Sequence, residues 1–264
     1  MRWAVLACVL AAVALPLAGC GGGGGVTESP LAAAATATRS SETMRFSMSG
    51  TFTLAGHSAA FEGLGSADTG SGRSSMSLSS QAASTGQTDT DMVMDGSVLY
   101  IRSPELKRWV KFDFEKLGED VGGGIDSMLM VGGRSNPIEV LAYLDAAGPV
   151  EVLGTERVRG VETTHYRGEV DFARYADVLE EDDEDAAKRI RNLVDEAGGR
   201  LIVPLDVWVD ADDRVRRESY ELSIANDFSM KTTMELYDFG VDVDVEVPEG
   251  DVTDLTDILE KPGG

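Results

Sequence analysis

Two histidines and two acidic clusters hold the side chains of this 264-residue sequence that are suited to acid–base or metal chemistry. His57 and His165 each lie in a probable strand without a second ligand or base at a readable spacing, so a surface or partly buried ring explains each better. The sequence also lacks a Gly-x-Ser-x-Gly nucleophile elbow, a phosphate loop, a dinucleotide fingerprint and a His-Glu-x-x-His helix. These observations predict that the protein is not an enzyme.

The acidic clusters invite a calcium interpretation. The string DADDRV (210–215) supplies three aspartates, but an arginine and a valine stand where an EF-hand loop needs an oxygen ligand and a glycine. A turn between two strands explains this string better. The run of six carboxylates at 180–185 is better explained as a solvated loop whose end favours the start of a helix. We therefore expect no metal ion and no cofactor.

The N-terminus carries a cysteine at a position suited to lipid attachment. Arg2 precedes fourteen uncharged residues, 4–17. This run is shorter than the roughly 20 apolar residues of a membrane-spanning helix and is typical of a signal peptide. The string Leu17-Ala18-Gly19-Cys20 follows and resembles the bacterial lipobox. That resemblance implies cleavage after residues 1–19 and acylation of Cys20. The alternative is an ordinary signal peptide with an incidental cysteine.

Composition excludes several classes of protein. Lys and Arg number 23 against 46 Asp and Glu, which gives a net charge of -23. Such a balance argues against binding to nucleic acid and against a polybasic contact with anionic membranes. Both cysteines lie within the first twenty residues, so no thiol after Cys20 is available for catalysis, metal binding or a disulfide. Hydrophobic residues make up 42% of the chain, enough for a packed core.

The composition also divides the chain into segments. Five glycines at 21–25 precede an Ala-, Thr- and Ser-rich stretch, which predicts that residues 20–43 form a flexible tether behind the lipidated cysteine. Residues 44–248 are then the folded domain, and residues 249–264 a C-terminal tail.

Alternation with a period of two predicts antiparallel strands from Met44 onward. Apolar and hydroxyl side chains alternate as far as Leu54, and again in 75–80. Glycines 63, 65, 70 and 72 are interpreted as turns or bends between these two strands. Further strands are predicted at 92–94, 98–102, 109–112, 150–158, 162–170, 201–209, 220–224, 230–239 and 241–247, with hairpin turns at Asp95-Gly96 and Arg159-Gly160.

Helical spacing of apolar side chains appears in the middle of the chain, at 137–147, 172–179 and 190–197. Asn136 and Pro137 are suited to the start of the first of these helices. About ten strands and three to four helices predict one α+β domain built on a large antiparallel sheet.

Methionine is abundant, with ten residues in a chain of 6% aromatic content. Because its side chain is flexible and polarisable, methionine is suited to surfaces that accommodate variable apolar guests, although plain core filling is the alternative. The segment 122–133, with Met128 between two glycine clusters, is typical of a flap over a pocket or of a loose core plug.

Several strings resemble the LppX/LprAFG-type lipoproteins of actinobacteria, which share the fold of the LolA and LolB lipoprotein carriers. They are PLDVWVD (204–210) with the acidic turn after it, VLYI (98–101) followed by Trp109, and the Asn136-Pro137 helix start. The resemblance implies a strongly curved sheet, a half-barrel wrapped around helices, with an apolar cavity between them. It also implies the carriage of acylated lipids or lipoglycans across the cell envelope.

Together these features predict a lipoprotein anchored to the extracytoplasmic face of the cell membrane that binds the acyl chains of a lipid or lipoglycan and carries it between membranes. An envelope transport partner fits this prediction, whereas nucleic acid does not. The alternative is a non-catalytic sensor or interaction lipoprotein of the same fold with a filled core. The expected lining of the cavity is Phe46, Met48, Phe52, Leu54, Met76, Leu78, Met92, Met94, Met128, Leu141, Leu144, Phe172, Leu179 and Leu193.

Overall fold

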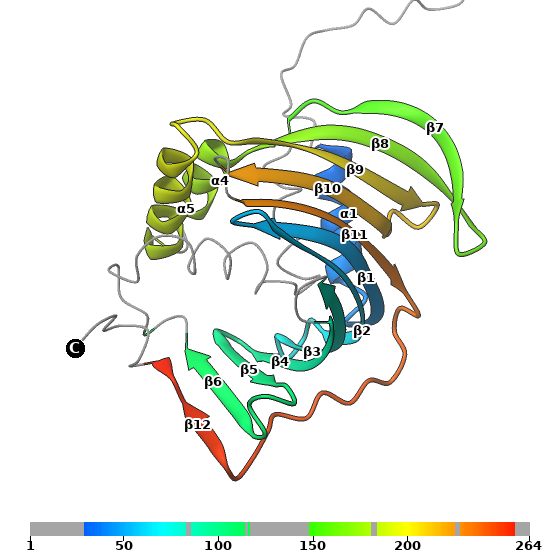
Figure 1. The fold of residues 1–264 in the computed structure, drawn as a ribbon. Helices are drawn as coiled ribbons and strands as arrows, with labels where there is room; N and C mark the ends of the chain where they lie inside the picture. Colours follow the sequence, from blue (N-terminus) through cyan, green and yellow to red (C-terminus); the bar gives the residue numbers. More distant parts are fainter. Residues whose placement is uncertain are drawn as a thin grey trace, which may run out of the picture.

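One large sheet dominates the fold (Figure 1). The computed structural model describes residues 29–82, 86–113, 116, 148–180, 184–224 and 228–256. Within these residues, one sheet of 12 strands accompanies helices α1, α4 and α5. The predicted α+β class and large antiparallel sheet are confirmed, and the sheet has slightly more strands than the ten or so that the sequence predicts.

The elements follow one another along the chain as α1 (Pro30–Arg39), β1 (Thr43–Leu54), β2 (His57–Asp68), β3 (Arg73–Ala82), β4 (Gly86–Asp95), β5 (Val98–Arg102), β6 (Trp109–Asp113), β7 (Glu151–Val158), β8 (Val161–Asp171), α4 (Phe172–Leu179), α5 (Glu184–Glu196), β9 (Ile202–Asp210), β10 (Val215–Ile224), β11 (Phe228–Tyr237) and β12 (Val252–Asp254). Across the sheet the order is β12-β6-β5-β4-β3-β2-β1-β11-β10-β9-β8-β7. Neighbouring strands are antiparallel, except that β12 runs parallel to β6.

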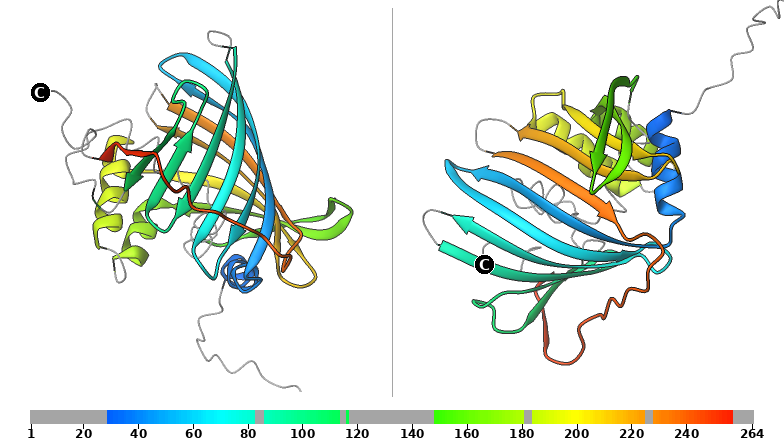
Figure 2. Two further views of the ribbon diagram at one scale, coloured as in Figure 1. Left: turned by 90° about the horizontal axis from the view of Figure 1, so that it is seen from below. Right: turned by 90° about the vertical axis from the view of Figure 1, so that its right-hand side faces the viewer.

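The sheet is strongly curved, and α4 and α5 lie on the inside of the curve, as the views in Figures 1 and 2 show. We call the face that shares its core with the helices the inner face, and the opposite one the outer face. Phe46, for example, lies on the inner face in one buried cluster with helix residues Leu31 and Ile190. Its neighbour Ser47 lies on the outer face, because successive side chains of a strand point to opposite sides.

The strand β2 corrects the interpretation of two glycines. Gly63 and Gly65 lie inside this strand rather than in turns between strands. Gly65 is the direct cross-strand partner of Phe46, and a side chain there would collide with the ring of Phe46. A glycine inside a strand often marks such a close approach.

The two predicted hairpin turns are confirmed. Gly96 joins β4 to β5 with a φ of 59°, and Arg159-Gly160 joins β7 to β8 with φ of 48° and 83°. Positive φ at the turn residues matches the right-handed twist of the paired strands, and glycine adopts it without strain.

Helices α4 and α5 confirm two of the three helix predictions. The Asp171 carboxylate caps α4 by accepting a hydrogen bond from the backbone N–H of Ala173 at 3.0 Å. Helix α5 begins at Glu184, so the end of the acidic run forms part of its first turn rather than a loop. The third predicted helix, at 137–147, and the predicted flap around Met128 lie outside the described residues.

Helix α1 shows that the tether prediction is wrong for residues 30–39. Pro30 occupies the first turn, the Ser29 hydroxyl accepts from the backbone N–H of Leu31, and Leu31, Ala34 and Ala35 are fully buried. Alanine has the highest helix propensity, and its small side chain lets α1 lie close to the sheet at β10. An alanine-rich composition therefore marks a packed helix here, not a flexible linker.

The C-terminal segment corrects two further predictions. Residues 241–247 form no strand, and β12 adds a strand within residues assigned to a tail. Both sides of β11 are already paired, with β1 and β10, so the chain that follows β11 has no open edge beside it. It crosses instead to the free edge of β6 and pairs there.

Candidate functional site

The inner face of the sheet carries the side chains that the sequence predicts as a cavity lining. Phe46, Met48, Met76, Phe172 and Leu193 belong to one buried apolar cluster, and Phe52, Leu78, Met92 and Leu179 pack against it. The structure thus brings nine of the predicted residues together on one side of the sheet. These nine residues come from strands β1, β3 and β4 and helices α4 and α5, and the same apolar cluster, which we call the inner wall, continues across β9, β10 and β11.

The other predicted lining residues are placed differently. Met94 is buried, but it is not among the members of this cluster. Leu54, at the end of β1, is 38% exposed. Met128, Leu141 and Leu144 lie outside the described residues.

Methionines of adjacent strands face one another on this wall. Met48 on β1 is the direct partner of Met234 on β11, and Met76 on β3 is the partner of Met92 on β4. Two flexible, polarisable thioether side chains side by side adapt their shape more readily than branched residues do. The sequence pattern places Met234 on an inward face, although the predicted lining omits it.

A carboxylic acid interrupts the apolar wall. Glu218 on β10 lies between Val207 on β9 and Met234 on β11, and it is 1% exposed. Neither of its carboxyl oxygens has a hydrogen-bond partner among the described residues. Burial raises the pKa of Glu218 to about 8, because the charged form loses its hydration. The sequence carries a signal for this placement, since Glu218 is two residues before Tyr220 and so shares its face.

Two further polar groups adjoin this acid on the inner face. Thr232 on β11 is 2% exposed, and its hydroxyl lies beside the Tyr220 hydroxyl, whose pKa it acts to lower. Tyr220 is the direct cross-strand partner of Thr232. Burial, and secondarily the Glu218 carboxyl, raise the pKa of Tyr220. These three residues, which we call the inner polar patch, form a small polar area on an apolar surface.

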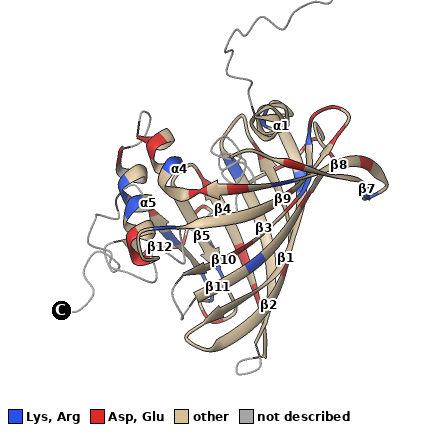
Figure 3. Cartoon of the chain, turned by 90° about the horizontal axis from the view of Figure 1, so that it is seen from above, with Lys and Arg blue, Asp and Glu red and all other residues tan. Residues whose placement is uncertain are grey.

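His165 and its partners form a network on the outer face. One ring nitrogen, Nδ1, lies 3.2 Å from Glu156 Oε1, and Nε2 lies 2.7 Å from Asp206 Oδ1. The ring stacks on Trp208 with centroids 4.1 Å apart. Figure 3 shows acidic and basic segments together on the helices and on this part of the sheet. Because these groups satisfy one another, the network is a structural one.

The other histidine is exposed, and the acidic turn at 210–215 has a structural role. His57 is exposed at the start of β2. Asp210 accepts hydrogen bonds from the backbone N–H of Arg214 and from the Arg216 side chain. Burial acts to raise the pKa of Asp210, but these bonds outweigh it and lower the pKa. The interpretation of 210–215 as a turn is confirmed. The described part of the chain contains no cluster of three metal-ligating residues.

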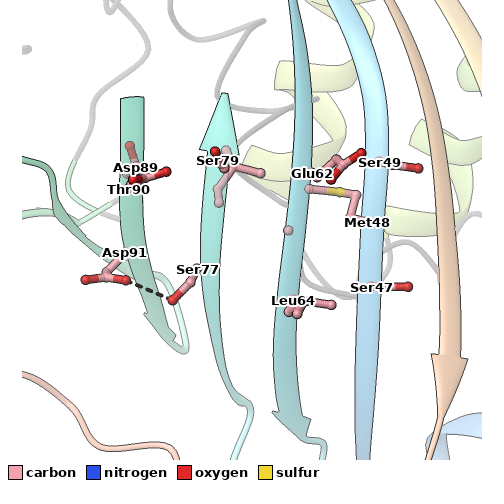
Figure 4. Close-up of a pocket in the computed structure, with 12 residues that line it drawn as sticks. Ser47, Met48, Ser49, Glu62, Leu64, Ser77, Ser79, Asp89, Thr90 and Asp91 are labelled. Carbon is pink, nitrogen blue, oxygen red and sulfur yellow. Dashed lines mark hydrogen bonds between the residues drawn. The ribbon is translucent and has the colours of Figure 1, made fainter. Parts of the chain in front are cut away.

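Two hollows lie on the outer face of strands β1–β6. One, of about 490 Å³, is lined largely by hydroxyl and carboxylate side chains, including Ser47, Glu62 and Asp91 (Figure 4). There the Ser77 hydroxyl donates to Asp91 at 2.8 Å. The other, of about 480 Å³, includes Arg45 and Trp109 among its lining residues. Both are open to solvent on the face turned away from the helices, so neither is the cavity between sheet and helices that the sequence predicts.

No helix of the described residues is long and apolar enough to cross a membrane. No family model matches this chain. An uncharacterized 31.2 kDa protein of Streptomyces griseus is 29% identical over 158 residues, which make up 60% of this chain and 51% of that protein. The chain therefore spans about half the length of the curated relative that it matches.

Solved structures of low sequence identity are similar to this chain. LprF from Mycobacterium bovis is 12% identical, with 84% of this chain and 96% of LprF covered and a TM-score of 0.45. The lipoprotein LppX from Mycobacterium tuberculosis is 14% identical, with 82% and 98% covered and a TM-score of 0.44. A putative outer membrane lipoprotein-sorting protein domain from Vibrio parahaemolyticus is 10% identical, with 78% and 90% covered and a TM-score of 0.28. LprF and LppX are lipoproteins of the type that the strings in the sequence resemble.

Proposed function

We propose that this protein is an envelope lipoprotein that binds the acyl chains of a lipid or lipoglycan at the inner face of its curved sheet and carries the lipid between membranes. The observation that supports this proposal most is the apolar, methionine-rich inner wall, which faces the helices, while serine, threonine and carboxylate side chains are frequent on the outer face of β1–β4. No catalytic step is part of the proposal.

The physical need for such a wall comes from the cost of moving an acyl chain through water. Each methylene exposed to water costs about 0.8 kcal/mol, so a chain of roughly sixteen carbons faces a barrier on the order of 12 kcal/mol. A wall of flexible thioether and aromatic side chains, such as Met48 beside Met234, lowers this barrier by replacing water around the chain.

In this proposal, Cys20 carries the acyl chains that anchor the protein at the extracytoplasmic face of the membrane. Two or more acyl chains together anchor a protein stably, whereas one does so only marginally. Because α1 begins at Pro30, about nine residues connect the anchor to the folded domain. The glycine-rich tether that the sequence predicts would have a reach of roughly 16 Å over this length, short enough to keep the domain close to the membrane surface.

A second candidate function is a sensor or interaction lipoprotein with a filled core. The specific observation in its favour is the deep burial of the inner wall, where Phe46 and Leu236 are each 1% exposed. Atoms of the protein itself already cover these side chains. In this candidate the inner wall is an ordinary core, and the function lies on the outer face.

A transfer assay separates the two candidates. The full chain with Cys20→Ala is mixed with donor vesicles that contain a fluorescent phospholipid and a non-exchangeable quencher, together with unlabelled acceptor vesicles. Carriage predicts that the rate at which fluorescence recovers rises in proportion to protein concentration. The sensor candidate predicts the spontaneous rate at every concentration. A variant with Met48→Glu places a charge on the inner wall and is expected to abolish the acceleration, while Ser47→Glu on the outer face retains it.

A further inference from the structure

The inner polar patch holds a buried acid, Glu218, that pairs with no other side chain of the described residues. Both carboxyl oxygens of Glu218 lie out of contact with water and have no hydrogen-bond partner among the described residues. An unpaired buried polar group destabilises a protein, and such groups concentrate at functional sites. The unpaired carboxyl oxygens of Glu218, with the Thr232 hydroxyl on the neighbouring strand, are suited to hydrogen-bond a polar group of a bound molecule.

The surroundings of Glu218 define what kind of partner fits. Its cross-strand neighbours Val207 and Met234 are apolar, and no Lys or Arg of the described residues forms an ion pair with it. A buried carboxyl without a cation retains its proton, in agreement with the raised pKa of Glu218. Protonated, it offers one O–H donor and one carbonyl acceptor, and the Thr232 hydroxyl offers an O–H donor and an oxygen that accepts.

Such a set of groups is complementary to uncharged oxygen chemistry. An ester carbonyl of a ligand accepts from the O–H of the protonated Glu218 carboxyl. A glycerol or sugar hydroxyl of a ligand donates to the carbonyl oxygen of the same carboxyl. A hydrocarbon chain satisfies neither group. An ammonium headgroup requires the ionised carboxylate, which burial disfavours. The patch therefore discriminates between a plain chain and a chain that ends in an ester or hydroxyl.

We propose that Glu218 and Thr232 bind the uncharged ester and hydroxyl groups at the junction between the acyl chain and the headgroup of a bound lipid. This proposal rests on the proposed function, because it requires that a lipid enters between the sheet and its helices. The apolar wall binds the chain, and the inner polar patch fixes how far along the wall the chain lies.

Two probes with hydrocarbon chains of similar length test this proposal. Monolaurin carries a glycerol ester on its chain, and tridecane is a hydrocarbon of similar length without polar atoms. The assay measures how well each probe displaces the fluorophore N-phenyl-1-naphthylamine from the delipidated full chain with Cys20→Ala. The variants in that background are Glu218→Met, which is apolar and of similar length, Glu218→Gln, which retains a donor and an acceptor, and Thr232→Val. Glu221→Gln, on the opposite face of the same strand, is the matched control.

With Glu218→Met, we expect the affinity for monolaurin, measured by displacement, to fall about tenfold, equivalent to roughly 1.4 kcal/mol. Thr232→Val is expected to weaken it several-fold, and Glu218→Gln and Glu221→Gln less than twofold. Tridecane is expected to bind all the variants equally.

Equal weakening of both probes by Glu218→Met, or no weakening of either, would contradict the role of the inner polar patch and leave the apolar site intact. Failure of both probes to displace the fluorophore from the protein that carries only Cys20→Ala would contradict the proposed function itself, and the role of the inner polar patch with it. Glu218→Met is expected to fold, because it replaces an unpaired buried acid with an apolar side chain. Circular dichroism of each variant checks this.

Discussion

The ring of Phe46 lies against the backbone of Gly65, its direct partner across strands β1 and β2. A Cβ atom built on Gly65 would stand 2.3 Å from the ring carbon Cζ and 2.4 Å from the backbone oxygen of Ser75. Both distances are shorter than a van der Waals contact. The absence of a side chain at Gly65 therefore lets the aromatic ring approach the backbone of β2 this closely.

This contact predicts that Gly65→Ala destabilises the protein by about 1–3 kcal/mol, the usual effect of overpacking a core. Urea unfolding followed by fluorescence measures the change. Phe46→Leu with Gly65→Ala is expected to be more stable than the two separate changes would give, because the smaller side chain relieves the collision. Ser66→Ala, on the outer face of the same strand, is the control. A Gly65→Ala variant as stable as the control would show that the ring does not depend on this glycine.

The same pair shows what the sequence could and could not predict of the fold. Alternation of apolar and hydroxyl residues predicts β1 and β3 because the pattern is local. Strand β2 is missed, since Gly63 and Gly65 resemble turn residues until the partner ring of Phe46 is known. Helix α1 is missed for a similar reason, because an alanine-rich helix depends on a distant surface, here β10, to pack against.

Thr38 predicts a measurable link between α1 and the sheet. Its buried hydroxyl donates to the backbone oxygen of Ala34 at 2.7 Å and accepts from the backbone N–H of Val215 at 2.8 Å. Thr38→Val retains the shape of the side chain and leaves the N–H of Val215 without this partner. We expect a loss of about 1–3 kcal/mol in the free energy of unfolding, measured with urea. Thr36→Val, exposed on the same helix, is expected to change it by less than about 0.5 kcal/mol.

Glu218 predicts that stability falls as pH rises. The pKa of the carboxyl is about 8 in the folded protein, against an ordinary value of 4.5. Between these two values the unfolded chain releases its proton and the folded chain retains it, so each increase in pH favours unfolding. Below pH 4.5 both states hold the proton, and this contribution to stability is fully present. Across the window the loss is on the order of a few kcal/mol.

The glutamine variant isolates this effect. Glu218→Gln cannot titrate, so its free energy of unfolding is expected to vary less between pH 5 and pH 8 than that of the wild type. Glu221→Gln, which removes an exposed carboxylate from the same strand, is expected to retain the wild-type slope. Parallel curves for the wild type and Glu218→Gln would contradict the assignment of a protonated, buried acid at this position.

Cys20 predicts where the protein is found in the cell. With the natural cysteine, the chain is expected in the membrane fraction of a bacterial host and to incorporate a radiolabelled fatty acid. Cys20→Ala removes the acceptor thiol, so the chain is expected to lose the label and leave the membrane fraction. Retention of label by Cys20→Ala would show that the lipobox resemblance is incidental.

The candidate site was predictable in its apolar part and not in its polar part. Phe46, Met48 and Met76 follow from alternation along single strands, which fixes the face of each side chain. Glu218 is in phase with Tyr220 and Leu222, but a carboxylate in that position indicates an exposed face unless the pairing of β10 with β9 and β11 is known. Leu54 is exposed because the strand ends there, and periodicity alone does not locate the end of the core.

The most direct test of the account is native mass spectrometry of the full chain with Cys20→Ala, made in a lipid-rich bacterial host and purified without detergent. Binding of a lipid at the inner face predicts discrete species heavier than the polypeptide by the mass of an acylated lipid, with the same lipid recovered by solvent extraction. Met48→Glu is expected to reduce these species, and Ser47→Glu to retain them. A spectrum of bare polypeptide alone would contradict the account and favour a sensor with a filled core.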